Sequence, residues 1–242
     1  DGIRDFCLSR GLGDVYKRQV LTFVKGDEAV QHIIRVLGMA SKSVSVTSYT
    51  YNLPEMHRVL QALPPQGVEV TFMQCKQSFI RGSTSKMAQY IEELIVAGVQ
   101  VLFWNYSRKS DEMRTLMPKG ASGRYSALHM KTIIVDKEIV LSGSMNWSSN
   151  SAQNCLELFT SSRLKQMVAP LVRFHEQLAK LCFPLDSDLM ERLEAQKRRD
   201  YEVEIKKSLK MSKARAQGEG KALVDSSAAG VGTYVDDSDI PC

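Results

Sequence analysis

The sequence predicts an α/β domain with a mixed, largely parallel β-sheet and helices on both faces of the sheet. Between residues 20 and 183, runs rich in β-branched and aromatic residues alternate with one-sided apolar patterns of helical period. Helix-like segments separate several of the strand-like runs, which is the spacing of crossover connections between parallel strands. Clusters of turn-forming residues, such as residues 64–67, mark the element boundaries. Together these observations indicate a layered α/β domain.

The expected elements follow in chain order. Residues 27–39 place Val30, Ile33 and Leu37 on one side and therefore predict an amphipathic helix. Residues 43–51 alternate with a period of two and predict a strand. A helix that starts near Pro54 and ends at residues 64–67 comes next. Further strands are expected at residues 68–73, 99–104, 128–135, 139–141 and 156–160, and further helices at residues 85–97 and 163–181, the last with Pro170 as a kink or a restart.

Composition changes at both ends of this predicted domain. Residues 1–19 show neither the period of a helix nor that of a strand and in part resemble translated adapter sequence, so we expect a non-native or disordered leader. The absence of an anchor or targeting signal at this end is therefore weak evidence that the protein lacks one. Residues 20–183 are expected to form the catalytic domain. Residues 184–215 predict a charged helical extension, and residues 216–242, which are small, polar and finally acidic, predict a disordered tail.

Overall composition narrows the function only slightly. The chain has 242 residues and a formal net charge of +5, which suits a plain soluble surface as well as one that meets nucleic acid or anionic lipid. The five cysteines are scattered without metal-ligand spacing, which indicates free thiols in a reducing compartment and argues against a structural zinc. No run reaches the roughly twenty apolar residues of a membrane-spanning helix.

Basic residues gather at two places outside the expected elements. Residues 105–127 carry Arg108, Lys109 and Arg124 with interleaved tyrosines, and Lys76 and Arg81 follow the second predicted strand. A long connection without its own pattern is either functional or disordered. We therefore consider a substrate groove that tracks phosphates and a solvated loop as two open interpretations.

The stretch from His129 to Asn146 holds the residues with the most specific chemistry. On a strand, positions two apart point to the same side, so the imidazole of His129 and the ammonium of Lys131 are expected to converge. Gly143 permits close backbone approach, and Ser144 and Asn146 supply hydrogen-bond donors. With Lys131 they form a predicted cradle for phosphate oxygens.

Two carboxylates near this stretch receive different predictions. Asp136 lies at an odd offset from His129, which directs it away from the imidazole, so we assign it with Lys137 to a hairpin turn. Glu157 is expected to enter the last core strand, where a carboxylate is costly to bury without a partner. A histidine is the natural partner, because the carboxylate would fix its tautomer. Glu157 is therefore predicted to orient His129.

These residues resemble the signature of the phospholipase D superfamily, His-x-Lys-x(4)-Asp followed by Gly-Ser-x-Asn. The single copy is similar to the one-motif branch, which includes bacterial Nuc-type endonucleases and mitochondrial cardiolipin hydrolases. Ser144, Asn146 and Glu157 lie at the offsets from the histidine that this branch uses. The likeness extends from about residue 23 to residue 182.

The resemblance implies a two-step displacement that needs no metal and no cofactor, with His129 as the nucleophile. It also implies a second histidine, and His32, His57 and His175 lie on predicted helices, where surface or packing roles are expected. A symmetric homodimer in which two copies of His129 meet is therefore the expected assembly.

The substrate stays open between cardiolipin-type phospholipid, with peripheral membrane contact, and single-stranded nucleic acid. A catalytically silent phosphate-binding scaffold and a phosphatidyl or nucleotidyl transferase are the further alternatives. The sequence alone assigns no location. The resemblance implies an intracellular protein, at the mitochondrial outer membrane in the cardiolipin hydrolase branch.

Overall fold

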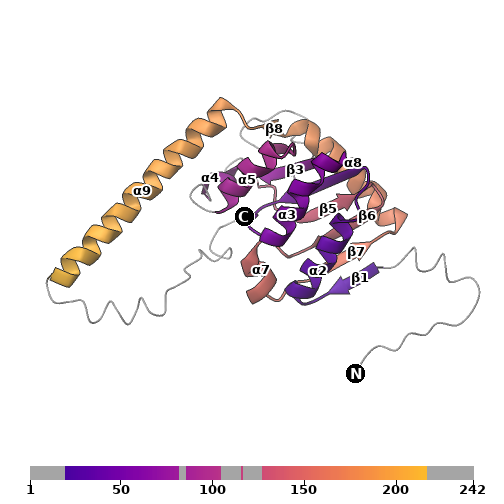
Figure 1. Ribbon diagram of the computed structural model, residues 1–242, viewed down its shortest axis with the longest axis horizontal. Coiled ribbons are helices and arrows are strands. Elements are labelled where there is room, and N and C mark those ends of the chain that lie inside the picture. Colours follow the sequence, from indigo (N-terminus) through magenta and orange to yellow (C-terminus); the bar gives the residue numbers. More distant parts are fainter. Residues whose placement is uncertain (1–19, 82–85, 105–115, 117–126, 217–242) are drawn as a thin grey trace, which may run out of the picture.

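The fold is built on one mixed β-sheet of eight strands. The computed structural model describes residues 20–81, 86–104, 116 and 127–216 (Figure 1). The strand order across the sheet is β1-β7-β6-β5-β2-β3-β4-β8. The strands are β1 (Val20–Phe23), β2 (Ser43–Ser48), β3 (Glu69–Cys75), β4 (Gln100–Trp104), β5 (Thr132–Val135), β6 (Ile139–Gly143), β7 (Phe159–Ser162) and β8 (Phe183–Pro184).

The prediction of a mixed α/β sheet is confirmed, but its description as largely parallel is wrong. Only the β2–β3 and β3–β4 pairings are parallel, and the other five pairings are antiparallel. Helical crossovers join β2, β3 and β4, whereas a tight turn joins β5 to β6. A tight turn can only reverse the chain, so a hairpin enters the sheet antiparallel.

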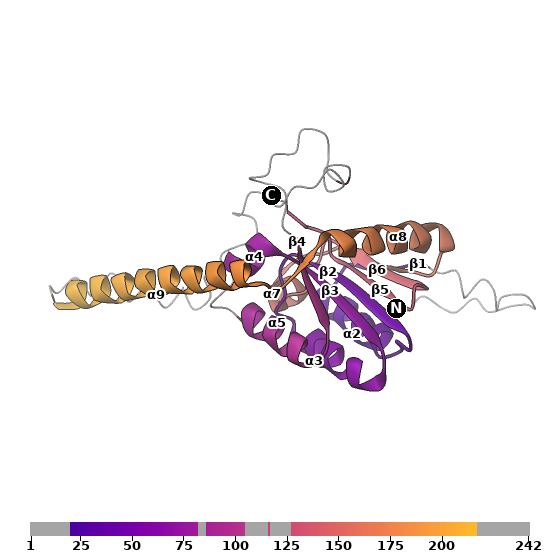
Figure 2. The ribbon, with the colours of Figure 1, turned by 90° about the horizontal axis from the view of Figure 1, so that it is seen from above.

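Helices cover both faces of the sheet, as predicted. Figure 2 shows α2, α3 and α5 on one side and α8 on the other. The helices are α2 (Gly26–Leu37), α3 (Pro54–Ala62), α4 (Lys76–Arg81), α5 (Lys86–Val96), α7 (Ser149–Asn154), α8 (Lys165–Leu181) and α9 (Ser187–Ala216), with a 3-10 turn at Pro64–Gln66. Pro170 lies inside α8, which is assigned as one helix from Lys165 to Leu181.

The larger core fills the space between the sheet and α2, α3 and α5. The apolar stripe of α2, including Ile33 and Leu37, packs there with Val44 and Val46 of β2. A smaller cluster lies at the end of the sheet where β2, β3 and β4 finish. It includes Tyr49, Met73, Trp104, Leu128 and Leu178. Because Leu128 directly precedes His129 and the Tyr49 ring contacts the His129 ring, this cluster adjoins the predicted nucleophile.

The helix α9 projects away from the domain (Figures 1 and 2). Its first turns are anchored, because Leu189 and Leu193 are buried in the larger core. Residues 201–212 are exposed throughout. The predicted leader at residues 1–19, most of the basic loop at 105–127 and the predicted tail from residue 217 onward lie outside the described residues, so those predictions stay as they were.

Candidate active site

His129 and Lys131 meet immediately before β5. The ammonium nitrogen of Lys131 lies 2.9 Å from both ring nitrogens of His129 and donates to the His129 carbonyl oxygen at 3.1 Å. An ammonium donates only to a ring nitrogen with a lone pair, and a neutral imidazole has one such nitrogen, so only one of these two contacts can be a hydrogen bond. The strand begins at Thr132, four residues later than predicted, yet the two side chains converge as expected.

Tyr49 completes the surroundings of this pair and was not predicted as a site residue. Its ring meets the His129 ring edge to face, with 4.6 Å between centroids and an angle of 64°. The Lys131 ammonium lies 5.7 Å from the centre of the same ring, within reach of a cation–π interaction. Gln74 holds the Tyr49 backbone by donating to its carbonyl oxygen at 2.6 Å. The sequence signal was its place near the end of the strand predicted at residues 43–51, although β2 itself ends at Ser48.

Ser144 and Glu157 form a second polar pair. The Ser144 hydroxyl donates to the Glu157 carboxylate and accepts from the Leu158 backbone N–H at 3.0 Å. The Ser144 backbone N–H donates to the Leu158 carbonyl oxygen at 2.9 Å. The end of β6 is therefore tied to the segment before β7 through both backbone and side chain.

The predicted role of Glu157 is wrong in two respects. Glu157 is half-buried and lies before β7, which begins at Phe159. Its hydrogen-bond partner within the described residues is Ser144 and not His129. The alternation that predicted a strand from residue 156 is misleading, because Leu156 and Leu158 are 97% and 56% exposed. The carboxylate therefore avoids the burial that would have required a histidine partner.

Gly143 is required by close packing between strands. A side-chain Cβ at this position would lie 2.8 Å from Cα of Phe159 and closer still to the Leu158 carbonyl oxygen. Backbone atoms cannot move aside for it as a flexible side chain could. The close backbone approach that this glycine was predicted to permit is therefore an approach of the chain's own backbone. Because Gly143 has no side chain, the neighbouring Ser144 can form its hydrogen bonds with the Leu158 backbone.

Asn146 lies in a turn that is anchored to the end of β2. Asn146 is 7% exposed, and the fully buried Trp147 follows it. The Trp147 indole N–H donates to the Thr47 carbonyl oxygen at 2.8 Å, and the Trp147 carbonyl accepts from the backbone of Asn52 and Leu53. Trp147 thus has a structural role, and its anchored backbone fixes the position of the preceding residue, Asn146.

Asp136 lies at the opposite end of β5, in the turn where it was predicted. Asp136 and Lys137 have positive φ angles of 52° and 58° and belong to the three residues between the paired Val135 and Ile139. The Asp136 carboxylate accepts hydrogen bonds at 2.8–2.9 Å from the backbone N–H groups of residues 41–43 and from the Ser41 hydroxyl. Partial burial alone would raise its pKa, but these hydrogen bonds outweigh burial and lower the pKa.

Comparison with known proteins identifies the family of this domain. Residues 33–179 match the family described as "Cardiolipin synthase, PLD-like domain". The chain belongs to this phospholipase D-like family. The human protein named mitochondrial cardiolipin hydrolase is 28% identical over 130 residues, which are 53% of this chain and 42% of the relative. The mouse protein of that name is 26% identical over 129 residues, 48% of its length. The chain thus spans less than half the length of these relatives.

Two solved structures share the phospholipase D-like fold. NucT from Helicobacter pylori has a TM-score of 0.53 at 20% identity and covers 69% of this chain and 99% of its own. The phospholipase D family member Nuc from Salmonella typhimurium has a TM-score of 0.53 at 18% identity, with 70% and 98% covered. At these identities the likeness shows a common fold.

The predicted groove of the phospholipase D-like domain is only partly within the described residues. Lys76 is 4% exposed, and its ammonium pairs with Asp188 of α9 at 3.2 Å. This ion pair contradicts the prediction of Lys76 as a groove cation, because its charge is already neutralised by a segment far along the chain. Arg81 is exposed at the end of α4. Arg108, Lys109 and Arg124 lie outside the described residues.

The three other histidines of the phospholipase D-like chain are packing residues and not surface residues. His32, His57 and His175 are 6%, 4% and 3% exposed. His57 stacks on Tyr90, with 3.9 Å between ring centroids, and contacts Glu93 at 2.7 Å. One ring nitrogen of His175 lies 2.9 Å from the Ser45 hydroxyl, and burial lowers the His175 pKa to about 4.

Two features are absent from the described residues. No group of three or more His, Cys, Asp or Glu side chains there is arranged as metal ligands. No helix within those residues combines the length and apolar character that crossing a membrane requires.

Proposed function

We propose that this phospholipase D-like protein hydrolyses phosphodiesters through a covalent phosphohistidine at His129, without a metal ion or other cofactor. The observation that carries the proposal is the 2.9 Å contact between the Lys131 ammonium and the His129 ring, at a site where Lys131 is only 6% exposed. A buried cation beside a nucleophilic imidazole is suited to a phosphate, because it neutralises the charge that repels a nucleophile.

The proposed reaction has two displacements at phosphorus. In the first, a ring nitrogen of His129 forms a P–N bond while the bond from phosphorus to the leaving oxygen breaks. A second histidine gives that oxygen its proton. In the second, the same histidine takes a proton from water, the water oxygen bonds to phosphorus and the P–N bond breaks. Both histidines return to their starting states, and no electrons are exchanged with another molecule.

We assign the phosphate oxygens to Lys131 and Asn146. The hydroxyl hydrogen of Ser144 is directed to Glu157, so Ser144 is less suited to bind phosphate than the sequence suggested. Ser144 and Glu157 instead hold the turn that carries Asn146. The hydrogen bonds of Ser144 and Glu157 therefore position Asn146 without contacting the phosphate themselves.

The second histidine is proposed to come from a second copy of the chain. His32, His57 and His175 are buried in helix packing and have partners of their own. A two-fold homodimer would place His129 of each copy at one site, with one as nucleophile and the other as acid. The two-fold symmetry would also bring Lys131 and Asn146 of both copies around the phosphate.

The direct test uses a small activated diester, bis(p-nitrophenyl) phosphate, with the full chain. Wild type should release nitrophenolate, and His129→Asn and His129→Ala should lose all measurable turnover while keeping the same unfolding midpoint. Lys25→Gln, an exposed lysine before α2, is the control and should match wild type. Turnover that persists in both His129 variants would refute the mechanism. If the wild-type protein never forms phosphohistidine, it would be the catalytically silent phosphate-binding scaffold instead of an enzyme.

Two substrate classes remain candidates within this function. The cardiolipin-type phospholipid is supported by the names of the curated relatives at 26–28% identity. Single-stranded nucleic acid is supported by basic side chains, which are considered next. Cardiolipin vesicles, single-stranded DNA and single-stranded RNA, each compared with the His129→Asn variant, separate the two. Added alcohol acceptors in the same assays would reveal a transferase through a phosphodiester product.

A further inference from the structure

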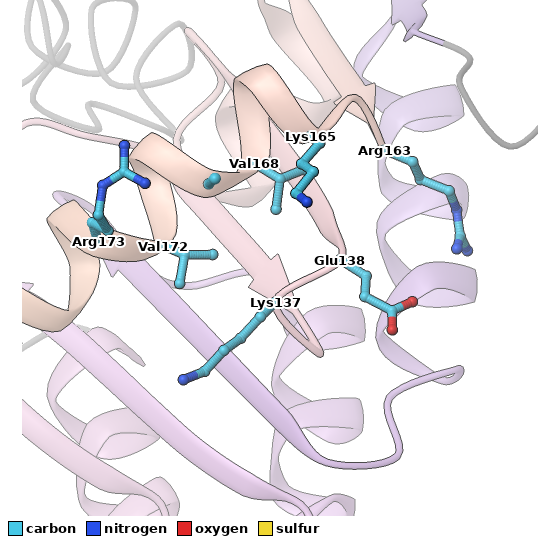
Figure 3. A pocket seen from close by; sticks show the side chains of 8 residues that line it. Lys137, Glu138, Arg163, Lys165, Val168, Val172 and Arg173 are labelled. Atoms are coloured by element: carbon cyan, nitrogen blue, oxygen red, sulfur yellow. The ribbon is translucent and has the colours of Figure 1, made fainter.

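A cavity of about 600 Å³ lies between α8 and the turn that joins β5 to β6. It is remote from the catalytic residues, because His129 precedes β5 and Lys137 follows it. Eight residues of extended chain at about 3.3 Å each separate them by roughly 25 Å. Figure 3 shows Val168 and Lys165 of α8 facing the turn residues Lys137 and Glu138. The cavity therefore belongs to another part of the molecule than the catalytic site.

The lining of this cavity is strongly basic. Of the eight described residues that line it, four are cations, Lys137, Arg163, Lys165 and Arg173, and one is a carboxylate, Glu138. Lys137 is paired with Glu176 at 2.7 Å. Across the part of the chain that the structure describes, the other three cations make no ion pair. An electrostatic site with uncompensated charge of this kind attracts anions.

The cations are spread along the cavity and do not meet at one point. Figure 3 shows Arg163 and Arg173 at opposite ends, with Lys165 between them. An extended chain of separate negative charges fits this arrangement better than one compact headgroup. The apolar lining consists of Val168, Ala169 and Val172, which are buried or half-buried and therefore unable to insert into a bilayer.

The helix α8 connects this cavity with the catalytic end of the sheet. Its 17 residues span about 25 Å at 1.5 Å per residue. Near its end, Leu178 packs in the same cluster as Leu128 and Tyr49, and the Tyr49 ring contacts His129. A polymer laid along α8 would therefore reach both places. At about 3.4 Å per nucleotide along a strand, roughly eight nucleotides cover the distance.

We propose that this cavity is an exosite for the sugar–phosphate backbone of single-stranded nucleic acid. The inference rests on the proposed function and names the substrate class for it. Arg163 and Arg173 bind phosphates at the two ends, and Lys165 binds between them. Among the described residues that line the cavity there is no aromatic side chain for bases to stack on, so the contact is expected to read the backbone and not the sequence.

The first test measures binding without turnover, in the full chain with His129→Asn. A fluorescent 20-nucleotide single strand is titrated at several salt concentrations, with and without R163Q/R173Q. The control is K25Q/R58Q, which removes the same charge from exposed positions at α2 and α3. Loss of two phosphate contacts should lower the slope of log affinity against log salt by about 1 and weaken binding about tenfold, while the control stays unchanged. Equal slopes for the two double variants would overturn the exosite.

The second test measures kinetics in proteins that keep His129. R163Q/R173Q should raise KM for the 20-mer about tenfold and leave its kcat alone, because the contacts are remote from the reacting phosphorus. Kinetics with bis(p-nitrophenyl) phosphate should not change. If wild type fails to cleave this small diester, the proposed function fails while the binding experiment still decides the exosite.

A third arm distinguishes a lipid surface. Vesicles containing phosphatidylglycerol are sedimented with the same His129→Asn proteins. Vesicle binding that R163Q/R173Q abolishes, together with unchanged oligonucleotide binding, would assign the cavity to a membrane and overturn the proposal.

Discussion

Ser144 donates its hydroxyl hydrogen to Glu157 and at the same time accepts a hydrogen bond from the Leu158 backbone. These hydrogen bonds join the end of β6 to the segment before β7. They hold Ser144 in place, and Asn146 lies two residues after Ser144. Glu157 therefore acts on the proposed site through Ser144. If the Glu157 carboxylate contacted His129 directly, it would orient the imidazole itself. Substitutions of Glu157 can distinguish this role from positioning through Ser144.

Substitution of Glu157 tests this indirect role. Glu157→Ala removes the acceptor, so the turn loosens and kcat should fall on the order of tenfold to a hundredfold, as small misplacements of a reacting group do. Glu157→Gln keeps a carbonyl oxygen that can accept from Ser144 and should retain most of the activity. Steady-state kinetics with bis(p-nitrophenyl) phosphate provide the measurement. Equal losses in both variants would show that the charge matters and that Glu157 acts on a histidine.

Tyr49 is expected to position the His129 ring. Tyr49→Phe preserves the aromatic edge and the face near Lys131, so its kcat should stay within about twofold of wild type. Tyr49→Leu removes the ring and should lower kcat about tenfold with a smaller effect on KM. Kinetics and the pH dependence of kcat check this, because a purely structural role would leave the pH profile of Tyr49→Leu unchanged. Identical behaviour of the two variants would contradict the prediction.

Asp136 should contribute to stability and not to catalysis. Asp136→Ala loses the acceptor of four hydrogen bonds and a residue that tolerates positive φ, so we expect a loss of about 2 kcal/mol in the free energy of unfolding. Asp136→Asn keeps the turn and should lose less. Urea unfolding measures both, and the kcat of folded protein should equal that of wild type. A large loss of kcat in folded Asp136→Asn would place the carboxylate in the chemistry.

The same carboxylate predicts a dependence of stability on acid. Because hydrogen bonds lower the pKa of Asp136 in the folded state, its contribution is fully present above the unfolded pKa, near 4. It is lost as the pH falls through the lower folded pKa. Urea unfolding from pH 6 downward should therefore show wild type losing more stability than Asp136→Asn. Parallel curves for the two proteins would count against the hydrogen-bond explanation.

The shared-site dimer predicts how mixtures behave. When wild type and His129→Asn are mixed equally and allowed to exchange subunits, about one quarter of the dimers carry two intact histidines. Activity per total dimer should then fall to about one quarter of the pure wild type, whereas independent sites would leave about one half. Sedimentation of wild type should give a dimer. A fully active monomer would refute the assembly.

Much of the element order was predictable because it depends on local patterns. The one-sided stripe of α2 and the alternation of β2 reflect burial of one face, and both elements lie close to their predicted residues. The convergence of His129 and Lys131 followed from their spacing and survived a later strand start at Thr132. By contrast, the exposed Leu156 and Leu158 misled the prediction for Glu157, because an apolar side chain in sequence is not necessarily a buried one.

The sequence by itself determined the α/β class, most of the segments that form helices and strands, and the types of functional group in the His129–Asn146 stretch. These depend on side-chain type and on periods of a few residues. Only the tertiary structure decided which strands pair antiparallel, that Asp188 neutralises Lys76, that Tyr49 faces His129, and that Arg163 and Arg173 line one cavity with Lys137. Each of these joins residues far apart in the chain. Such contacts depend on how whole elements pack and on the register between strands, which local patterns do not contain.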